Sequence, residues 1–129
     1  MSREVIATDR APAAVGPYSQ ACSAGKSRTL YLSGQIPIDP KSGELLRGSV
    51  AEQAQRCMDN LEGVLQAAGL GFGHVVRCTI YLTDMGDFAA VNEVYGRCFD
   101  DPPPARACVQ VAALPKGAQV EIDAIAERD

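Results

Sequence analysis

Apolar residues recur at helical spacing in two segments of the chain. In residues 49–69 they stand three or four positions apart and form a single stripe. Ser49 and Glu52 have the spacing of a capping box, in which each side chain satisfies a backbone N–H of the first turn, and Gly69 suits the end of the helix. Residues 87–99 carry a second stripe, and the three prolines that follow prevent its extension. The pattern therefore predicts two helices, each with one buried face.

Shorter apolar runs rich in β-branched residues indicate strands. They cover residues 29–34, 74–83, 105–113 and 119–126, and residues 4–8 and 17–25 are plausible edge strands. The segment 36–45 carries two prolines and a glycine, which favour a turn. The order of strands, helix, strand, helix and strands predicts a single α+β domain over residues 1–129, in which both helices pack on one face of one sheet.

The alternation of side chains along a strand predicts which residues lie on the sheet face that no helix covers. Alternate side chains of a strand point to opposite faces, so each strand divides into two sets. In the two strands nearest the C-terminus, we assign a mixed polar and apolar set to the uncovered face: Arg106, Cys108, Gln110 and Glu121. Such a face is neither an apolar core nor a plain solvent surface, and it suits an oligomer interface with a polar site inside.

Charge and composition narrow the classes of partner. The formal net charge is −4 and no basic run occurs, which argues against a nucleic-acid partner. No apolar stretch reaches the roughly 20 residues of a membrane span, so no membrane partner is expected. The first residues lack the order of a signal peptide, and we therefore expect a cytoplasmic protein.

The five cysteines and the single histidine indicate neither a disulfide framework nor a metal site. The cysteines are odd in number and scattered, and no C-x-x-C spacing occurs. One histidine cannot supply a histidine-based metal cluster. We expect most of the thiols to be small buried apolar groups, His74 to lie in a surface turn, and no metal to be bound.

Arg106 and Glu121 are the residues with the clearest chemical potential. Arg106 follows the prolines at the start of a strand, where its planar guanidinium would be held ready to grip a carboxylate through two parallel hydrogen bonds. Glu121 could position a water or move a proton, and partial burial would raise its pKa from about 4.3 toward a useful value. The alternative is a structural salt bridge between these two residues at an interface.

Three motifs carry a resemblance to a known family. The most specific is PPARACVQVAALPKGAQVEIDAIA at residues 103–126, and it occurs with GPYSQA at 16–21 and LSGQIPID at 32–39. Together they resemble the reactive intermediate deaminase family, the RidA/YjgF-type proteins. The likeness includes both helical segments and the strand VVRCTIYLTDM, so it runs over nearly the whole chain. No departure occurs at a position that the family uses for its site.

The resemblance implies a fold, an assembly and a reaction. The fold would be chorismate-mutase-like, with a six-stranded mixed sheet and two helices on one face. Three subunits would pack sheet-inward into a homotrimer, with sites in the clefts between neighbours. The substrates would be reactive enamines and 2-imino acids, such as 2-aminoacrylate and its four-carbon analogue, which pyridoxal-phosphate dehydratases release. Water would attack the imine carbon to give a 2-keto acid and ammonia, without a metal or an organic cofactor.

The resemblance also assigns catalytic roles to residues of this chain. Arg106 matches the arginine that binds the substrate carboxylate. Glu121 matches the glutamate that positions the attacking water and serves proton transfer to the leaving nitrogen. Cys108 matches a cysteine whose backbone contacts the ligand, so its thiol would not be the nucleophile.

Four further residues match positions around the family's cleft. Tyr18 matches a tyrosine that closes the cleft, from the same or the adjacent subunit, although it could equally be packed in the core. Ser33 and Gly34 match a turn that walls the pocket, where the glycine leaves space for a close approach of the backbone. Asn92 matches a helix asparagine near the site, and the alternative for it is a solvated position on the helix surface.

Two other classes of function stay open. Some family members are described as single-strand endoribonucleases and translation inhibitors, but the acidic balance of this chain argues against that function. A non-enzymatic binder of keto acids, or a chaperone-like protein, would use the same cleft without catalysis. The intact pair of Arg106 and Glu121 favours an enzyme.

Overall fold

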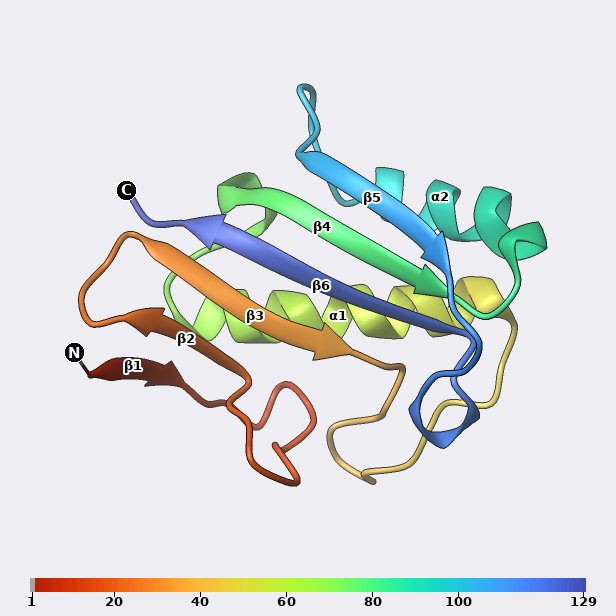
Figure 1. Cartoon of the computed structure of the whole chain (residues 1–129), viewed down its shortest axis with the longest axis horizontal. Coiled ribbons are helices and arrows are strands. Elements are labelled where there is room, and N and C mark those ends of the chain that lie inside the picture. Colours follow the sequence, from red (N-terminus) through yellow and green to blue (C-terminus); the bar gives the residue numbers. More distant parts are fainter. Residues whose placement is uncertain (1) are drawn as a thin grey trace.

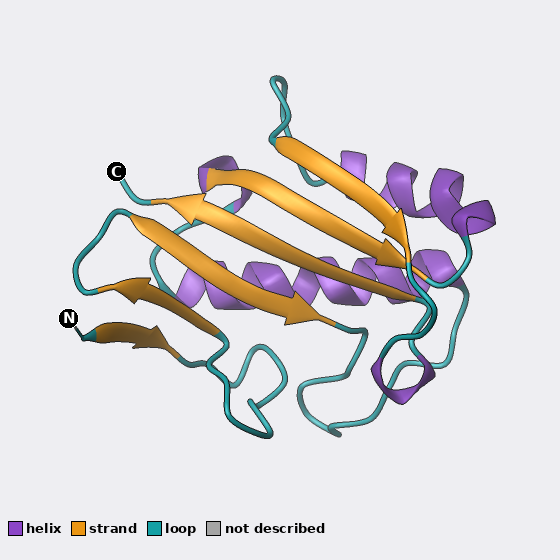
Figure 2. Cartoon of the chain, viewed as in Figure 1, coloured by secondary structure: helices purple, strands orange, loops and turns teal. Residues whose placement is uncertain are grey.

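The computed structural model describes residues 2–129, which form one six-stranded sheet with both helices on the same face (Figure 1 and Figure 2). The strands are β1 (Arg3–Ile6), β2 (Ala21–Ala24), β3 (Thr29–Gln35), β4 (Val75–Leu82), β5 (Ala105–Gln110) and β6 (Val120–Glu127), and the helices are α1 (Val50–Ala67) and α2 (Phe88–Gly96). The strand order is β1-β2-β3-β6-β4-β5, and only β4 and β5 are parallel neighbours. The predicted α+β fold is confirmed.

α1 begins and ends with the predicted caps. Ser49 Oγ accepts a hydrogen bond from the Glu52 backbone N–H at 3.2 Å, and the Glu52 carboxylate accepts one from the Ser49 N–H at 3.0 Å. Gly69 has a φ of 77°, and both it and Leu70 donate back to carbonyls of the last turn. The apolar stripe of α1 is buried against the sheet, which anchors the core.

α2 is shorter than the predicted helix over residues 87–99. It ends at Gly96, well before the prolines, because glycine in a helix interior is unfavourable by about 1 kcal/mol. Cys98 and Phe99 lie beyond the helix but still pack partly against the core. The apolar spacing of this segment therefore predicted the buried residues correctly, whereas it overestimated the length of the helix.

The strands lie where the apolar runs predicted them, although several of them are shorter than predicted. β5 ends at Gln110 rather than at residue 113, and β2 begins at Ala21 rather than at residue 17. Residues 36–45 form the predicted turn, in which the Asp39 carboxylate accepts hydrogen bonds from the backbone N–H groups of Lys41 and Ser42.

β4 lies between β5 and β6 and determines which of their residues share a face. Ile80 of β4 is fully buried against the helices, and its register partner on β5 is Cys108. Tyr81 is the next residue, so it points to the uncovered face with its partners Val109 on β5 and Glu121 on β6. Glu121 and Cys108 therefore belong to opposite faces.

The prediction that Arg106, Cys108, Gln110 and Glu121 share one mixed face is wrong. Glu121 lies on the uncovered face, but the other three lie on the face that the helices cover. Alternation within a strand divides its residues between the two faces of the sheet. It does not reveal which residues of one strand share a face with which residues of another strand. That correspondence depends on the register of both strands with β4, which the sequence alone does not reveal.

The cysteines are all free thiols, and they differ in burial. Cys57 and Cys78 are fully buried, whereas Cys22, Cys98 and Cys108 are half-buried. His74 lies in the turn before β4, where its Nδ1 accepts a hydrogen bond from the Gly71 N–H at 3.2 Å. Neither helix in residues 2–129 is long and apolar enough to cross a membrane.

Candidate active site

Arg106 lies on β5 at the edge of the sheet, over two aromatic rings of α2. Its Cζ is 5.5 Å from the ring centroid of Phe88 and 5.1 Å from that of Tyr95. Cation–π attraction holds a guanidinium at such rings. Tyr95 is buried and packs against Phe99, with the ring centroids 4.8 Å apart, so the rings form a rigid platform.

Asn92 fixes the orientation of the guanidinium. Arg106 Nη1 donates a hydrogen bond to Asn92 Oδ1 at 2.6 Å, one turn of α2 after Phe88. Asn92 is exposed, yet it is more than a solvated helix residue because of this bond. Within residues 2–129 no carboxylate forms an ion pair with Arg106. One of five N–H donors is engaged by Asn92, and the others are available to an anionic ligand.

Cys108 follows Arg106 by two positions and points to the same face. Its side chain packs partly against the core, and burial raises the pKa of its thiol. A thiol with a raised pKa is a poor nucleophile at neutral pH, because the thiolate is the reactive form. Beyond it, Gln110 Oε1 accepts a hydrogen bond from the Met85 N–H at 2.8 Å and ties β5 to the segment before α2.

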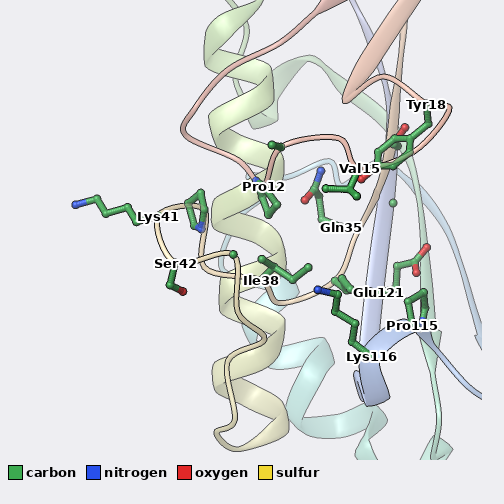
Figure 3. A pocket seen from close by; sticks show the side chains of 16 residues that line it. Pro12, Val15, Tyr18, Gln35, Ile38, Lys41, Ser42, Pro115, Lys116 and Glu121 are labelled. Atoms are coloured by element: carbon green, nitrogen blue, oxygen red, sulfur yellow. The ribbon is translucent and has the colours of Figure 1, made fainter.

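A second cluster surrounds Glu121 at a cavity of about 690 Å³ (Figure 3). Four of the candidate residues line it: Tyr18, Ser33, Gly34 and Glu121. Much of the remaining wall is apolar and comes from three loops: Pro12, Ala13, Val15, Ile36, Ile38, Pro40 and Pro115. The ammonium group of Lys41 points away from Glu121 (Figure 3), and Lys116 also lines the cavity.

Gly34 makes room for the Glu121 carboxylate. β3 has two residues, Ser33 and Gly34, where β6 has only Asp123, so β3 bulges at this point. A Cβ atom at Gly34 would collide with the side chain of Glu121. The two residues wall the cavity from a strand bulge rather than from a turn, and the space left by the glycine is filled by Glu121 itself.

The carboxylate of Glu121 is half-buried and has no hydrogen-bond partner in the part of the chain that the structure describes. Burial raises the pKa of this carboxyl group, and the charge of nearby Asp123 raises it further. A carboxyl with a raised pKa exchanges protons closer to neutral pH than an ordinary glutamate does. Glu121 can therefore accept a hydrogen bond from a water or transfer a proton to a ligand.

Buried amide side chains hold the loops around the cavity, and the sequence pattern did not predict this role for them. Gln20 binds the loop before β2: its Oε1 accepts from the Thr8 N–H at 2.7 Å, and its Nε2 donates to nearby carbonyls. Asn60 of α1 donates to the Ile38 carbonyl at 2.9 Å. Gln53 of α1 supports the loop before β6 through hydrogen bonds to Gln119. The sequence feature that could have identified these amides is the position of a polar residue among apolar neighbours.

The candidate residues therefore form two clusters within one chain. Arg106, Asn92 and Cys108 lie at the β5 edge on the helix side, and Tyr18, Ser33, Gly34 and Glu121 surround the cavity. Tyr18 is 51% exposed, which excludes the alternative of core packing. Arg106 and Glu121 form no salt bridge with each other within residues 2–129.

Comparison with known proteins decides the family. The sequence profile described as Endoribonuclease L-PSP matches residues 8–128. The chain belongs to the RidA/YjgF/L-PSP family. One RidA/YjgF/L-PSP relative, Protein DfrA of Myxococcus xanthus, is 61% identical over 126 residues, which cover 98% of this chain and 96% of DfrA.

Two further RidA/YjgF/L-PSP relatives have informative names. The 2-iminobutanoate/2-iminopropanoate deaminase of Mus musculus is 53% identical over 124 residues, which cover 96% of this chain and 90% of the mouse protein. The crystal structure of E. coli TdcF with bound serine has a TM-score of 0.90 and 43% identity, and the match covers 98% of this chain and 99% of TdcF. The chorismate-mutase-like RidA fold expected from the resemblance is confirmed.

Proposed function

We propose that this protein hydrolyses reactive enamines and 2-imino acids, such as 2-aminoacrylate and its four-carbon analogue, to 2-keto acids and ammonia. The observation that carries the proposal is a preorganised guanidinium that has no carboxylate partner among residues 2–129, on a chain that also holds a half-buried glutamate beside a cavity. The mouse relative named as an iminobutanoate and iminopropanoate deaminase supports the choice of substrate. TdcF binds serine, an amino acid with the same α-carboxylate as these substrates.

Each site is assembled from two chains of a homotrimer. Arg106 and Glu121 belong to different clusters of one chain, so a neighbour that brings its Arg106 to the cavity completes the site. The uncovered sheet face supports such packing, because Val5, Tyr31 and Val109 on this face are 53%, 53% and 41% exposed. A homotrimer with its sheets turned inward buries these side chains.

Hydrolysis then uses one residue from each cluster. The Arg106 guanidinium grips the substrate carboxylate through two N–H donors and holds the imine carbon in place. Glu121 accepts a hydrogen bond from water and takes its proton as the oxygen attacks the imine carbon. Glu121 then passes this proton to the nitrogen, and the hydroxyl group formed from the water supplies a second one. The C–N bond breaks, ammonia leaves, and the C=O bond of the keto acid forms.

The remaining candidate residues shape the cleft. Tyr18 covers its mouth, and Ser33 and Gly34 wall it beside Glu121. The backbone of Cys108 contacts the ligand, while its thiol takes no part in the reaction. Asn92 orients Arg106. Water is the only co-reactant, so the balance needs neither a metal nor an organic cofactor. We further propose a cytoplasmic location, since five unpaired thiols suit a reducing compartment.

The test is a trapping assay. A dehydratase or an amino-acid oxidase generates the imine, and semicarbazide captures whatever imine remains. We expect the protein to reduce trapping in proportion to its concentration and to release keto acid and ammonia together. Unchanged trapping across several amino acids, with intact oligomer, would contradict the proposal, and cleavage of single-stranded RNA by the same sample would favour the endoribonuclease alternative.

A further inference from the structure

Asp123 of β6 is held at both oxygens of its carboxylate by donors from β4. Its Oδ1 accepts a hydrogen bond from the backbone N–H of Thr79 at 2.9 Å, and its Oδ2 accepts one from the Tyr81 hydroxyl at 3.1 Å. All three side chains are half-buried on the uncovered face. A carboxylate with two such donors has a defined orientation and brings its negative charge to a defined place.

The negative charge of Asp123 lies beside Glu121. Glu121 and Asp123 are two residues apart on one strand, so they point to the same face, and Tyr81 lies directly opposite Glu121 in register. Tyr81 therefore faces both carboxylates, but its hydroxyl donates only to Asp123. The proposed hydrolysis uses Glu121 and assigns no role to Tyr81 or Asp123.

Among the described residues 2–129, Asp123 is the ionisable group whose charge acts on Glu121. Lys116 and Tyr18 line the same cavity, and within residues 2–129 neither forms a hydrogen bond or an ion pair with Glu121. β3 contributes only the bulge next to it, which has no ionisable side chain. Cys57 of α1 lies on the helix side, where burial raises the pKa of its thiol and keeps it uncharged.

We propose that Asp123 and Tyr81 are positioning residues for Glu121: Tyr81 holds the Asp123 carboxylate beside Glu121, and the Asp123 charge acts together with burial to tune proton transfer by Glu121. The inference rests on the proposed function, in which Glu121 both accepts and donates a proton. A group that does both works best when it titrates near the working pH.

The effect has a definite sign. A second negative charge disfavours the ionised form of a carboxyl group, so Asp123 adds to the effect of burial in raising the pKa of Glu121. Replacing Asp123 by asparagine removes this charge and should lower the pKa of Glu121. Replacing Tyr81 by phenylalanine releases one oxygen of the Asp123 carboxylate, so its charge is no longer held beside Glu121 and the pKa of Glu121 should also fall.

The direct test measures Glu121 itself in the full-length protein. Its side-chain carboxyl carbon is followed by NMR over a pH titration, with Glu121→Gln to assign the signal. We expect the midpoint to fall by about half a pH unit or more in Asp123→Asn. In Tyr81→Phe the midpoint should also fall, by less than in Asp123→Asn, because Thr79 still holds the other oxygen of Asp123. Tyr31→Phe is the control, since Tyr31 is an exposed tyrosine of the same face without a hydrogen bond to a carboxylate in the described chain, and it should not move the midpoint.

A midpoint in Asp123→Asn within about 0.2 pH unit of the wild type would overturn the inference. If that variant does not fold, an unchanged midpoint in Tyr81→Phe overturns it, because that change removes a single oxygen atom. The pH profile of kcat/KM for imine hydrolysis is measured on the same samples. If the NMR midpoint moves while the acid limb of kcat/KM does not, the inference about the pair stands, and the role of Glu121 in hydrolysis fails.

Discussion

Arg106 owes its orientation to side chains of α2 more than to its own strand. Two rings lie against its guanidinium, and the Asn92 amide accepts one N–H, so the long side chain has lost much of its freedom before any ligand arrives. Ordering a free arginine would cost up to about 2 kcal/mol of side-chain entropy at the moment of binding. The arrangement therefore suits a residue that binds an anion.

Arg106→Lys tests whether the planar fork is required. Lysine keeps the charge but loses the two parallel donors, and the loss of such a pair in a partly desolvated cleft costs about 2–5 kcal/mol. We expect kcat/KM for imine hydrolysis to fall roughly 30-fold or more, and Arg106→Ala to be at least as impaired. Sedimentation of the same samples should show an intact oligomer. An active lysine variant in a weakened oligomer would instead make Arg106 a structural salt-bridge residue.

The raised pKa of Glu121 suits proton transfer but lowers the stability of the folded protein at neutral pH. Its pKa in the folded protein is raised above the unfolded value of 4.5, so the folded state binds its proton more tightly. The free energy of unfolding therefore falls as pH rises from 4.5 through the folded pKa, and the loss stays constant above it.

Glu121→Gln should remove both the function and this cost. Imine hydrolysis should drop about 100- to 10,000-fold, while binding of the keto-acid product persists. The Tm should rise at pH 8 and should change little at pH 4, where most of the wild-type carboxyl is already protonated. Thermal melts at both pH values measure the difference. Near-wild-type hydrolysis in this variant would show that the glutamate is structural.

Cys108→Ser examines whether the thiol has a chemical role. Burial raises the pKa of the thiol, so little thiolate is present at neutral pH, and only the backbone is proposed to contact the ligand. We expect the serine variant to retain activity within a factor of a few. Loss of catalysis, together with loss of sensitivity to iodoacetamide, would show that the thiol reacts.

At the scale of elements, the bulge in β3 and the strand β6 form one unit. Two residues of β3 face one of β6, and the extra residue is the glycine whose missing side chain leaves room for the Glu121 carboxylate. The three loops around the cavity are in turn held by buried amides on α1 and before β2. The position of Glu121 thus depends on neighbouring strands as well as on its own.

Gly34→Ala should displace the Glu121 carboxylate, because the new Cβ would occupy its place. We expect hydrolysis to fall at least about 10-fold, since small displacements of a catalytic group have large effects. Gly73→Ala is the matched control, because a Cβ at Gly73 meets no atom of the described chain within 4 Å apart from its immediate chain neighbours, and its activity should be unchanged. Equal activity of the two variants would mean that the carboxylate does not act from its observed position.

The same elements show which features of the fold and the site could be predicted from the sequence alone. Capping residues and apolar spacing predicted α1 because those signals are local, and the family motifs named Arg106 and Glu121. The sequence could not place these two residues on opposite faces, because that relation arises from the register of β4 with both of its neighbours. The platform of Phe88 and Tyr95 was equally hidden, since it depends on how α2 packs over β5.

At the scale of the whole molecule, the proposed homotrimer accounts for both the uncovered sheet face and the separation of Arg106 from Glu121. Exposed apolar side chains lie on the face without helices, and Arg106 lies at the β5 edge, away from the Glu121 cavity. A closed homotrimer gives every chain two different neighbours, so each can donate an Arg106 and receive one. Three equivalent sites follow from this symmetry.

Mixing two inactive variants tests this account most directly. Arg106→Ala and Glu121→Gln are unfolded together in equal amounts, refolded, checked for oligomer mass, and assayed for imine hydrolysis. If each site takes Arg106 from one chain and Glu121 from the next, about a quarter of the sites in randomly mixed trimers are intact, and about a quarter of wild-type activity should return. Activity no higher than that of the separate variants, in confirmed mixed oligomers, would contradict a site shared between chains.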